Sequence, residues 1–148
     1  MNVGHRMIWI FAIALALATP AASHAAPPAE AVLYKDPACG CCAEYAKYLE
    51  RNGFAVTIID TGDLAAVKAE NGVPQALAGC HTLLVGGYVV EGHVPVSALG
   101  KLLSERPHIK GLSLPGMPPG SPGMSGSKSA PFVIFEISEG KPTIFMVE

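Results

Sequence analysis

The chain has 148 residues, a formal net charge of −2 at pH 7 and only 15 % charged residues. This length accommodates one small domain with one hydrophobic core. The sequence has neither a basic block nor interleaved aromatic and basic residues, so we expect no nucleic-acid partner.

Residues 1–25 have the layout of a secretory signal peptide. His5 and Arg6 precede the apolar run Met7–Ala18, which is followed by the small-x-small sequence Ser23-His24-Ala25. The apolar run is shorter than the roughly 20 residues that a membrane-spanning helix needs. We therefore predict cleavage near Ala25 or Ala26, no stable membrane anchor afterwards, and a periplasmic domain comprising residues 26–148. Export places the cysteines in an oxidising compartment, where disulfides persist.

Hydrophobic periodicity predicts alternating strands and helices over most of that domain. In chain order we expect a strand at 32–35, a helix at 42–52, a strand at 54–59, a helix at 63–70, a hairpin of strands 82–85 and 88–91, and a helix at 95–106. Two glycines between the β-rich runs of the hairpin favour a tight turn. The predicted fold class is therefore α/β, in the order β-α-β-α-β-β-α.

The remaining sequence changes character. Residues 111–130 are rich in glycine and proline and also contain Met117 and Met124, so we predict an irregular loop. Residues 131–148 contain two further β-rich runs, 132–137 and 143–147, that predict a terminal hairpin. A long loop without secondary structure is uncommon in a compact domain and is often functional.

Three of the four cysteines, Cys39, Cys41 and Cys42, lie between the first predicted strand and the first predicted helix. A helix N-terminus stabilises thiolate, the form that binds soft metals and attacks disulfides. These cysteines can close only tiny loops among themselves, which disfavours a purely structural role. One structural disulfide with a spare thiol is the simpler alternative. A mononuclear zinc site is also possible, although we expect the neighbouring side chains of Cys41 and Cys42 to point apart.

The element order, with Cys39-x-x-Cys42 at the start of a helix, resembles a thioredoxin fold. Residues 82–92 resemble the thioredoxin hairpin, which follows a cis-proline; here Cys80-His81 stands in place of that proline. The fold that this resemblance implies would bring six candidate ligands to one end of the sheet: Cys39, Cys41, Cys42, Cys80, His81 and His93.

A closer resemblance is to the CopG-like copper-resistance proteins, an exported family long described as a domain of unknown function. It rests on four sequence blocks within residues 31–125: Cys39-Gly40-Cys41-Cys42, Cys80-His81, Gly92-His93-Val94-Pro95, and Gly116-Met117-Pro118 with Gly120-Ser121-Pro122-Gly123-Met124. The resemblance implies a cluster of several Cu(I) ions bridged by the cysteines. It also implies a role in copper resistance, with copper redox activity as a further possibility.

The other candidate ligands are assessed from their own chemistry. Cys80 lies opposite the cysteine-rich turn in the implied fold, which favours a ligand over a buried thiol. His81 and His93 are either ligands or residues that orient ligands. Met117 and Met124 lie in a loop, where a thioether is free to bind a soft metal, so we interpret the loop as a lid. Lys35 and Asp36 flank the cysteine turn; we interpret them as a solvated strand end, with tuning of the charge of the turn as the alternative.

We therefore predict a periplasmic protein that binds copper ions and either sequesters them or passes them on to other periplasmic copper-handling proteins. An alternative from a different class is a thiol–disulfide oxidoreductase that uses Cys39 as nucleophile and Cys42 to resolve the mixed disulfide. The missing cis-proline and the competing thiols of Cys41 and Cys80 count against it. A third hypothesis is a disulfide-stabilised module that binds a protein partner and no metal.

Overall fold

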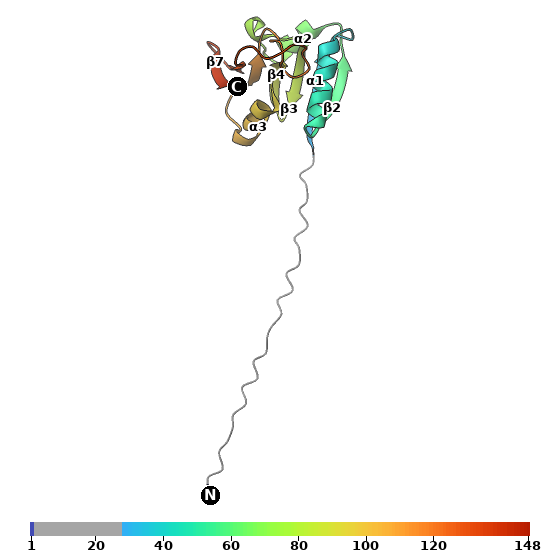
Figure 1. Cartoon of the computed structure of the whole chain (residues 1–148). Helices are drawn as coiled ribbons and strands as arrows, with labels where there is room; N and C mark the ends of the chain where they lie inside the picture. The colour runs from blue at the N-terminus through green and yellow to red at the C-terminus, as the bar shows by residue number, and fades with distance from the viewer. Residues whose placement is uncertain (2–27) are drawn as a thin grey trace.

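In the computed structural model, which describes Met1 and residues 28–148, one seven-stranded sheet is combined with three α-helices (Figure 1). The strands are β1 (Ala29–Lys35), β2 (Phe54–Asp60), β3 (His81–Val85), β4 (Tyr88–Gly92), β5 (Gly111–Leu114), β6 (Val133–Ile137) and β7 (Thr143–Val147). The helices are α1 (Gly40–Arg51), α2 (Leu64–Glu70) and α3 (Val96–Glu105), with a 3₁₀ turn, η1, at Gln75–Leu77.

The first four strands form the arrangement that the sequence predicts. Their spatial order is β2-β1-β3-β4, with β1 parallel to β2, β3 antiparallel to β1, and β4 antiparallel to β3. The thioredoxin-like α/β order is thus confirmed. Because β3 runs antiparallel to β1, its first residue, His81, pairs with the last residue of β1, Lys35. The start of β3 therefore lies beside the turn that leads into α1.

Helices α1 and α3 cover one face of the sheet. The buried residues of α1 are Cys42, Tyr45, Ala46 and Leu49, which follow the three-and-four spacing of a helix face. They pack in one core with Leu33 and Leu83 of the sheet and with buried residues of α3. This packing fixes the orientation of α1, and therefore of the cysteines in its first turn.

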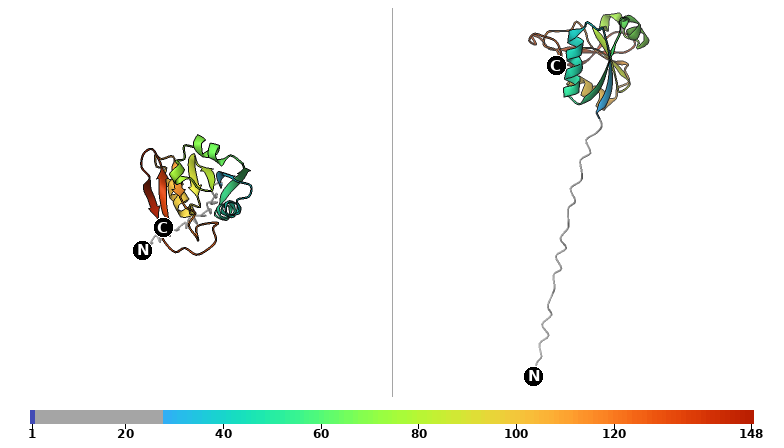
Figure 2. Two further views of the ribbon diagram at one scale, coloured as in Figure 1. Left: turned by 90° about the horizontal axis from the view of Figure 1, so that it is seen from above. Right: turned by 90° about the vertical axis from the view of Figure 1, so that its right-hand side faces the viewer.

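The opposite face carries α2 and η1 (Figure 2). Leu84 and Val89 alternate with the residues that face α1, and they pack with Leu77 of η1 in a second, smaller core. Lys68 of α2 reaches Thr82 and Glu91 on this same face. The sheet is therefore covered on both sides near the start of β3.

The predicted loop at 111–130 is wrong in its first four residues, because Gly111–Leu114 forms β5, parallel to β4. A side chain at Gly111 would place its Cβ 1.6 Å from the Val89 carbonyl oxygen. Glycine is thus needed here for close approach of two strands, although in the sequence it looked like a loop residue. The terminal hairpin is confirmed as β6 and β7, which extend the sheet beyond β5.

The predicted signal peptide lies outside the described residues, apart from Met1. Within the part of the chain that the structure describes, none of the helices has the length and apolar character needed to cross a membrane.

Candidate metal centre

The four cysteines lie together at one end of the sheet, with their sulfur atoms within 4.8 Å of one another. Cys39 and Cys42 form a disulfide, whereas Cys41 and Cys80 are free thiols. The Cys41 sulfur lies 3.5 Å from that of Cys39, and the Cys80 sulfur lies 3.4 Å from that of Cys42. Although Cys41 and Cys42 are neighbours in the sequence, their sulfur atoms also lie within 4.8 Å of each other.

The turn that carries the cysteines is held by Lys35. Its ammonium contacts the carbonyl oxygens of Asp36 (2.9 Å) and Pro37 (3.3 Å) and forms an ion pair with Asp60 (2.9 Å). Lys35 is only 6 % exposed, so its interpretation as a solvated strand end is wrong. The Asp36 carboxylate accepts a hydrogen bond from the Ala38 amide, which closes the turn ahead of Cys39.

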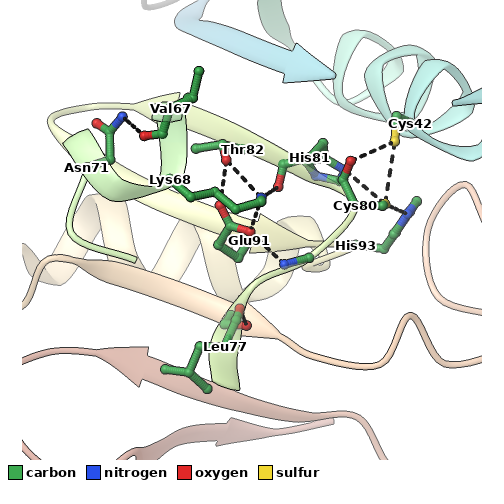
Figure 3. A network of polar contacts seen from close by, with 12 residues as sticks. Cys42, Val67, Lys68, Asn71, Leu77, Cys80, His81, Thr82, Glu91 and His93 are labelled. Carbon is green, nitrogen blue, oxygen red and sulfur yellow. Dashed lines mark hydrogen bonds and ion pairs between the residues drawn. The ribbon is translucent and has the colours of Figure 1, made fainter. Parts of the chain in front are cut away.

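Cys80 connects the cysteine turn to the two histidines. Its sulfur lies 3.2 Å from Nε2 of His93 and 3.6 Å from Nδ1 of His81 (Figure 3). Burial, with a further contribution from the neighbouring Cys41, raises the pKa of the Cys80 thiol to about 12. Cys80 is therefore a neutral thiol at neutral pH, and a metal ion must displace its proton to bind.

His93 is held in one tautomer by the loop that follows β5. Its Nδ1 lies 2.6 Å from the Pro122 carbonyl oxygen, which can only accept a hydrogen bond, so Nδ1 carries the proton. The lone pair of Nε2 therefore points at the Cys80 sulfur. Burial lowers the pKa of His93, which favours the neutral ring. A neutral imidazole with a fixed tautomer is the form in which histidine binds metals.

His81 is fully buried between the cluster and α1. Its ring stacks on the Tyr45 ring with the centroids 4.8 Å apart, and its Nε2 has no hydrogen-bond partner among the described residues. Burial, with smaller contributions from His93 and Lys68, lowers the pKa of His81 to about 3. The folded domain therefore holds a neutral imidazole beside Cys80.

This burial predicts an acid-sensitive contribution to stability. Because the pKa of His81 is depressed in the fold, the unfolded chain binds a proton first, so stability is full above pH 6.5 and falls as the pH decreases towards 3. Between pH 7 and 4.5 the metal-free protein should lose about 2–3 kcal/mol from this group. His81→Phe, which keeps a ring against Tyr45, should remove that part of the loss in urea unfolding. The matched variant His108→Phe, at an exposed histidine, should leave that loss unchanged. Equal losses in wild type and His81→Phe would contradict the assignment.

The loop from Pro115 to Pro131 passes along α1 beside the cluster. A Cβ on Gly123 would lie 2.6 Å from the Tyr45 amide nitrogen, so this part of the loop packs directly on the helix backbone. Met124 follows Gly123 and is partly buried, whereas Met117 is 36 % exposed and has a positive φ of 46°. The loop is thus attached to the site through Pro122 and Gly123, and a role for either thioether as a ligand remains a prediction.

Sequence reasoning missed a buried polar network directly behind Cys80. Glu91 is 0 % exposed, and its carboxylate accepts hydrogen bonds from the Lys68 ammonium, the Thr82 hydroxyl and the Gly79 amide, each at 2.6 Å (Figure 3). The available signal was a glutamate at the end of an otherwise apolar strand, next to Gly92 and the candidate ligand His93. Buried carboxylates are rare unless they are paired.

The donor set is suited to a soft metal ion. Thiolate and imidazole select Cu(I) and Zn²⁺, whereas hard cations prefer oxygen. Two groups of side chains converge: the four cysteines, and Cys80 with His81 and His93. Since Cys80 belongs to both groups, the two are parts of one site. Cys39 and Cys42 can contribute thiolates to it only after their disulfide is reduced. Fold and site together define a thioredoxin-like domain with a candidate soft-metal centre at the start of α1.

The comparisons with known proteins agree with this definition. Residues 77–124 match the DUF411 family, described as proteins of unknown function. Two solved structures, described as forms 1 and 2 of copper resistance protein CopG, each share 38 % identity and a TM-score of 0.75, covering 82 % of this chain and 98 % of theirs. A comparison with curated proteins finds no match. The chain belongs to the CopG-like copper-resistance family.

Proposed function

We propose that the protein binds copper in the periplasm as Cu(I), holding several ions between the thiolates of Cys39, Cys41, Cys42 and Cys80. The observation that carries the proposal is the convergence of four sulfur atoms within 4.8 Å. Thiolates so close together repel one another, and bridging monovalent soft cations compensate that charge. The similarity to structures of copper resistance protein CopG supports copper over zinc.

The histidines and methionines would complete the site. His93 offers the lone pair of Nε2 and is held by Pro122, while His81 supplies a second neutral imidazole beside Cys80. Met117 and Met124 would supply thioethers, which bind Cu(I) without losing a proton. The protein would then store copper or pass it to another periplasmic copper-handling protein.

The disulfide makes copper binding dependent on the redox state of the protein. Cu(I) binding needs thiolates, whereas the Cys39–Cys42 disulfide removes two of the four. The same pair supports the second candidate, a thiol–disulfide oxidoreductase with Cys39 as nucleophile. Among the described residues there is no cis peptide bond, so the substrate-binding cis-proline of thioredoxin has no counterpart here. The free thiols beside both disulfide sulfurs further favour a metal site.

The test is to load the reduced and the oxidised mature protein anaerobically with Cu(I), desalt both, and measure copper by elemental analysis and native mass spectrometry. The reduced protein should retain more than one copper per chain. The oxidised protein should retain clearly less, because two ligands are blocked. If the reduced protein retained no copper but reduced insulin at a rate comparable to thioredoxin, the oxidoreductase would be the better account.

A further inference from the structure

Gly79 and Cys80 directly precede β3 and belong to no helix or strand. Cys80 is nevertheless the residue that both groups of candidate ligands share. Its position is set from the face of the sheet opposite α1. Oε2 of Glu91 accepts a hydrogen bond from the Gly79 amide at 2.6 Å, just before Cys80. The Lys68 ammonium donates to the His81 carbonyl oxygen at 3.1 Å, just after Cys80. The backbone is thus fixed on both sides of the cysteine.

The two charged groups also bind each other. The Lys68 ammonium lies 2.6 Å from Oε2 of Glu91 and 3.1 Å from the Thr82 hydroxyl, which donates to Oε1 of Glu91. Both carboxylate oxygens therefore have partners, and the Lys68 side chain is only 15 % exposed. Figure 3 shows Lys68, Thr82 and Glu91 in contact with one another, with Cys80 and His93 to their right.

Close packing makes the arrangement sensitive to small shifts. A Cβ on Gly79 would lie 2.4 Å from the Gly92 amide nitrogen, so the segment before Cys80 crosses directly over the end of β4. His93 follows Gly92 in the sequence, and its Nε2 lies 3.2 Å from the Cys80 sulfur. A displacement of Gly79 would therefore change the distances from Cys80 to both His93 and Cys42.

Stability alone is a poor reason to keep this ion pair. Burying a lysine and a glutamate costs desolvation energy that their attraction often fails to exceed, and apolar replacements of similar size are frequently neutral or stabilising. What such replacements cannot supply is a hydrogen-bond acceptor for Gly79 and a donor for His81. The network therefore has a geometric role that packing cannot replace.

We propose that Lys68 and Glu91, with Thr82, are positioning residues that set the Cys80 sulfur where it bridges the cysteine turn and His93. They do not touch the metal themselves. The proposal rests on the proposed function for the identity of the bound ion, but the geometric claim applies equally to the metal-free protein. Residues behind metal ligands typically contribute 10–100-fold to metal affinity.

The experiment compares wild type, Glu91→Gln, Lys68→Met, Lys68→Arg and the double variant K68M/E91L, with Glu70→Gln as a control on the exposed side of α2. Cu(I) affinity is measured by competition with a chromogenic chelator, and amide hydrogen exchange of Gly79 and Cys80 is measured in the metal-free, reduced protein. Glu91→Gln and Lys68→Met should lose about tenfold or more in affinity. Lys68→Arg should retain most of it, since it keeps a charged donor, and Glu70→Gln should match wild type.

The double variant separates positioning from stability. K68M/E91L should fold with a thermal unfolding midpoint near that of wild type, yet lose both Gly79 amide protection and copper affinity. Wild-type copper affinity in a folded K68M/E91L protein would overturn the proposal, whatever the exchange rates. If wild type itself bound no copper, the proposed function would fail. The exchange data would then still decide the geometric claim, which unchanged Gly79 protection in the variants would overturn.

Discussion

Replacing Cys80 by serine should abolish most copper binding by the reduced protein. The Cys80 sulfur lies 3.4 Å from Cys42 and 3.2 Å from His93, so it is the atom that joins the cysteine turn to the histidines. Serine has nearly the same size but supplies a hard oxygen in place of a soft sulfur. We expect the number of ions per chain to fall and the Cu(I) affinity to drop by more than about 100-fold, the upper end of losses at residues behind ligands.

Cys41→Ser is the matched comparison. Cys41 is also a free thiol, and its sulfur lies 3.5 Å from that of Cys39, but the two histidines group with Cys80 alone. Its removal should cost fewer ions than removal of Cys80. Copper content is measured by native mass spectrometry, with thermal unfolding to confirm that each variant folds. Wild-type copper stoichiometry in a folded Cys80→Ser protein would rule out the shared cluster.

The second large effect is expected at Gly123, where the loop meets α1. Gly123→Ala places a Cβ 2.6 Å from the Tyr45 amide nitrogen at a φ of +81°, so the loop must move away from the helix. The neighbouring Pro122 carbonyl would then lose its hydrogen bond from His93. We expect a loss of about 2–4 kcal/mol in the free energy of unfolding, combining left-handed strain with the backbone clash.

Gly116→Ala is the control variant, because it introduces left-handed backbone strain without a steric clash. Gly116 lies in the same loop at a φ of +80°, but nothing lies within 4 Å of its added Cβ. It should lose only about 1–2 kcal/mol, the cost of a left-handed conformation. Urea unfolding of the metal-free proteins gives both values, and copper competition shows whether the loop also supports the metal site. Equal losses of unfolding free energy in Gly123→Ala and Gly116→Ala would mean that the contact of the loop with α1 contributes nothing to stability.

Most of the fold follows from patterns that are local in the sequence. The three-and-four spacing of Tyr45, Tyr48 and Leu49 predicts α1, and the glycine pair Gly86-Gly87 predicts the β3–β4 hairpin. The failure at Gly111 has a clear cause. The sequence shows a glycine at the start of a glycine- and proline-rich segment, whereas the need for it arises from a neighbouring strand, β4, more than twenty positions earlier.

The candidate site likewise divides into residues that the sequence identified and residues whose roles only the structure revealed. Spacing and residue type alone identified Cys39, Cys41 and Cys42 as candidates, because a helix N-terminus stabilises thiolate, the form of cysteine that binds metals and attacks disulfides. The resemblance to known families added Cys80 and His93. The roles of Lys35 and Glu91 depended on the tertiary structure. A charged side chain at a strand end is usually solvated, and only the packing of distant segments shows which ones are buried and which backbone groups they bind.

The sequence by itself therefore determined the order of the helices and of the described strands except β5, and it indicated the soft chemistry of the candidate ligands, since both follow from residue type and spacing. The tertiary structure decided which atoms meet. It brought the sulfur of Cys80 to the cysteine turn, turned the lone pair of His93 towards it, and placed Lys68 and Glu91 behind it. These contacts join residues 13 to 38 positions apart in the sequence. Their side chains meet only once the register of the strands and the packing on both faces of the sheet are established together.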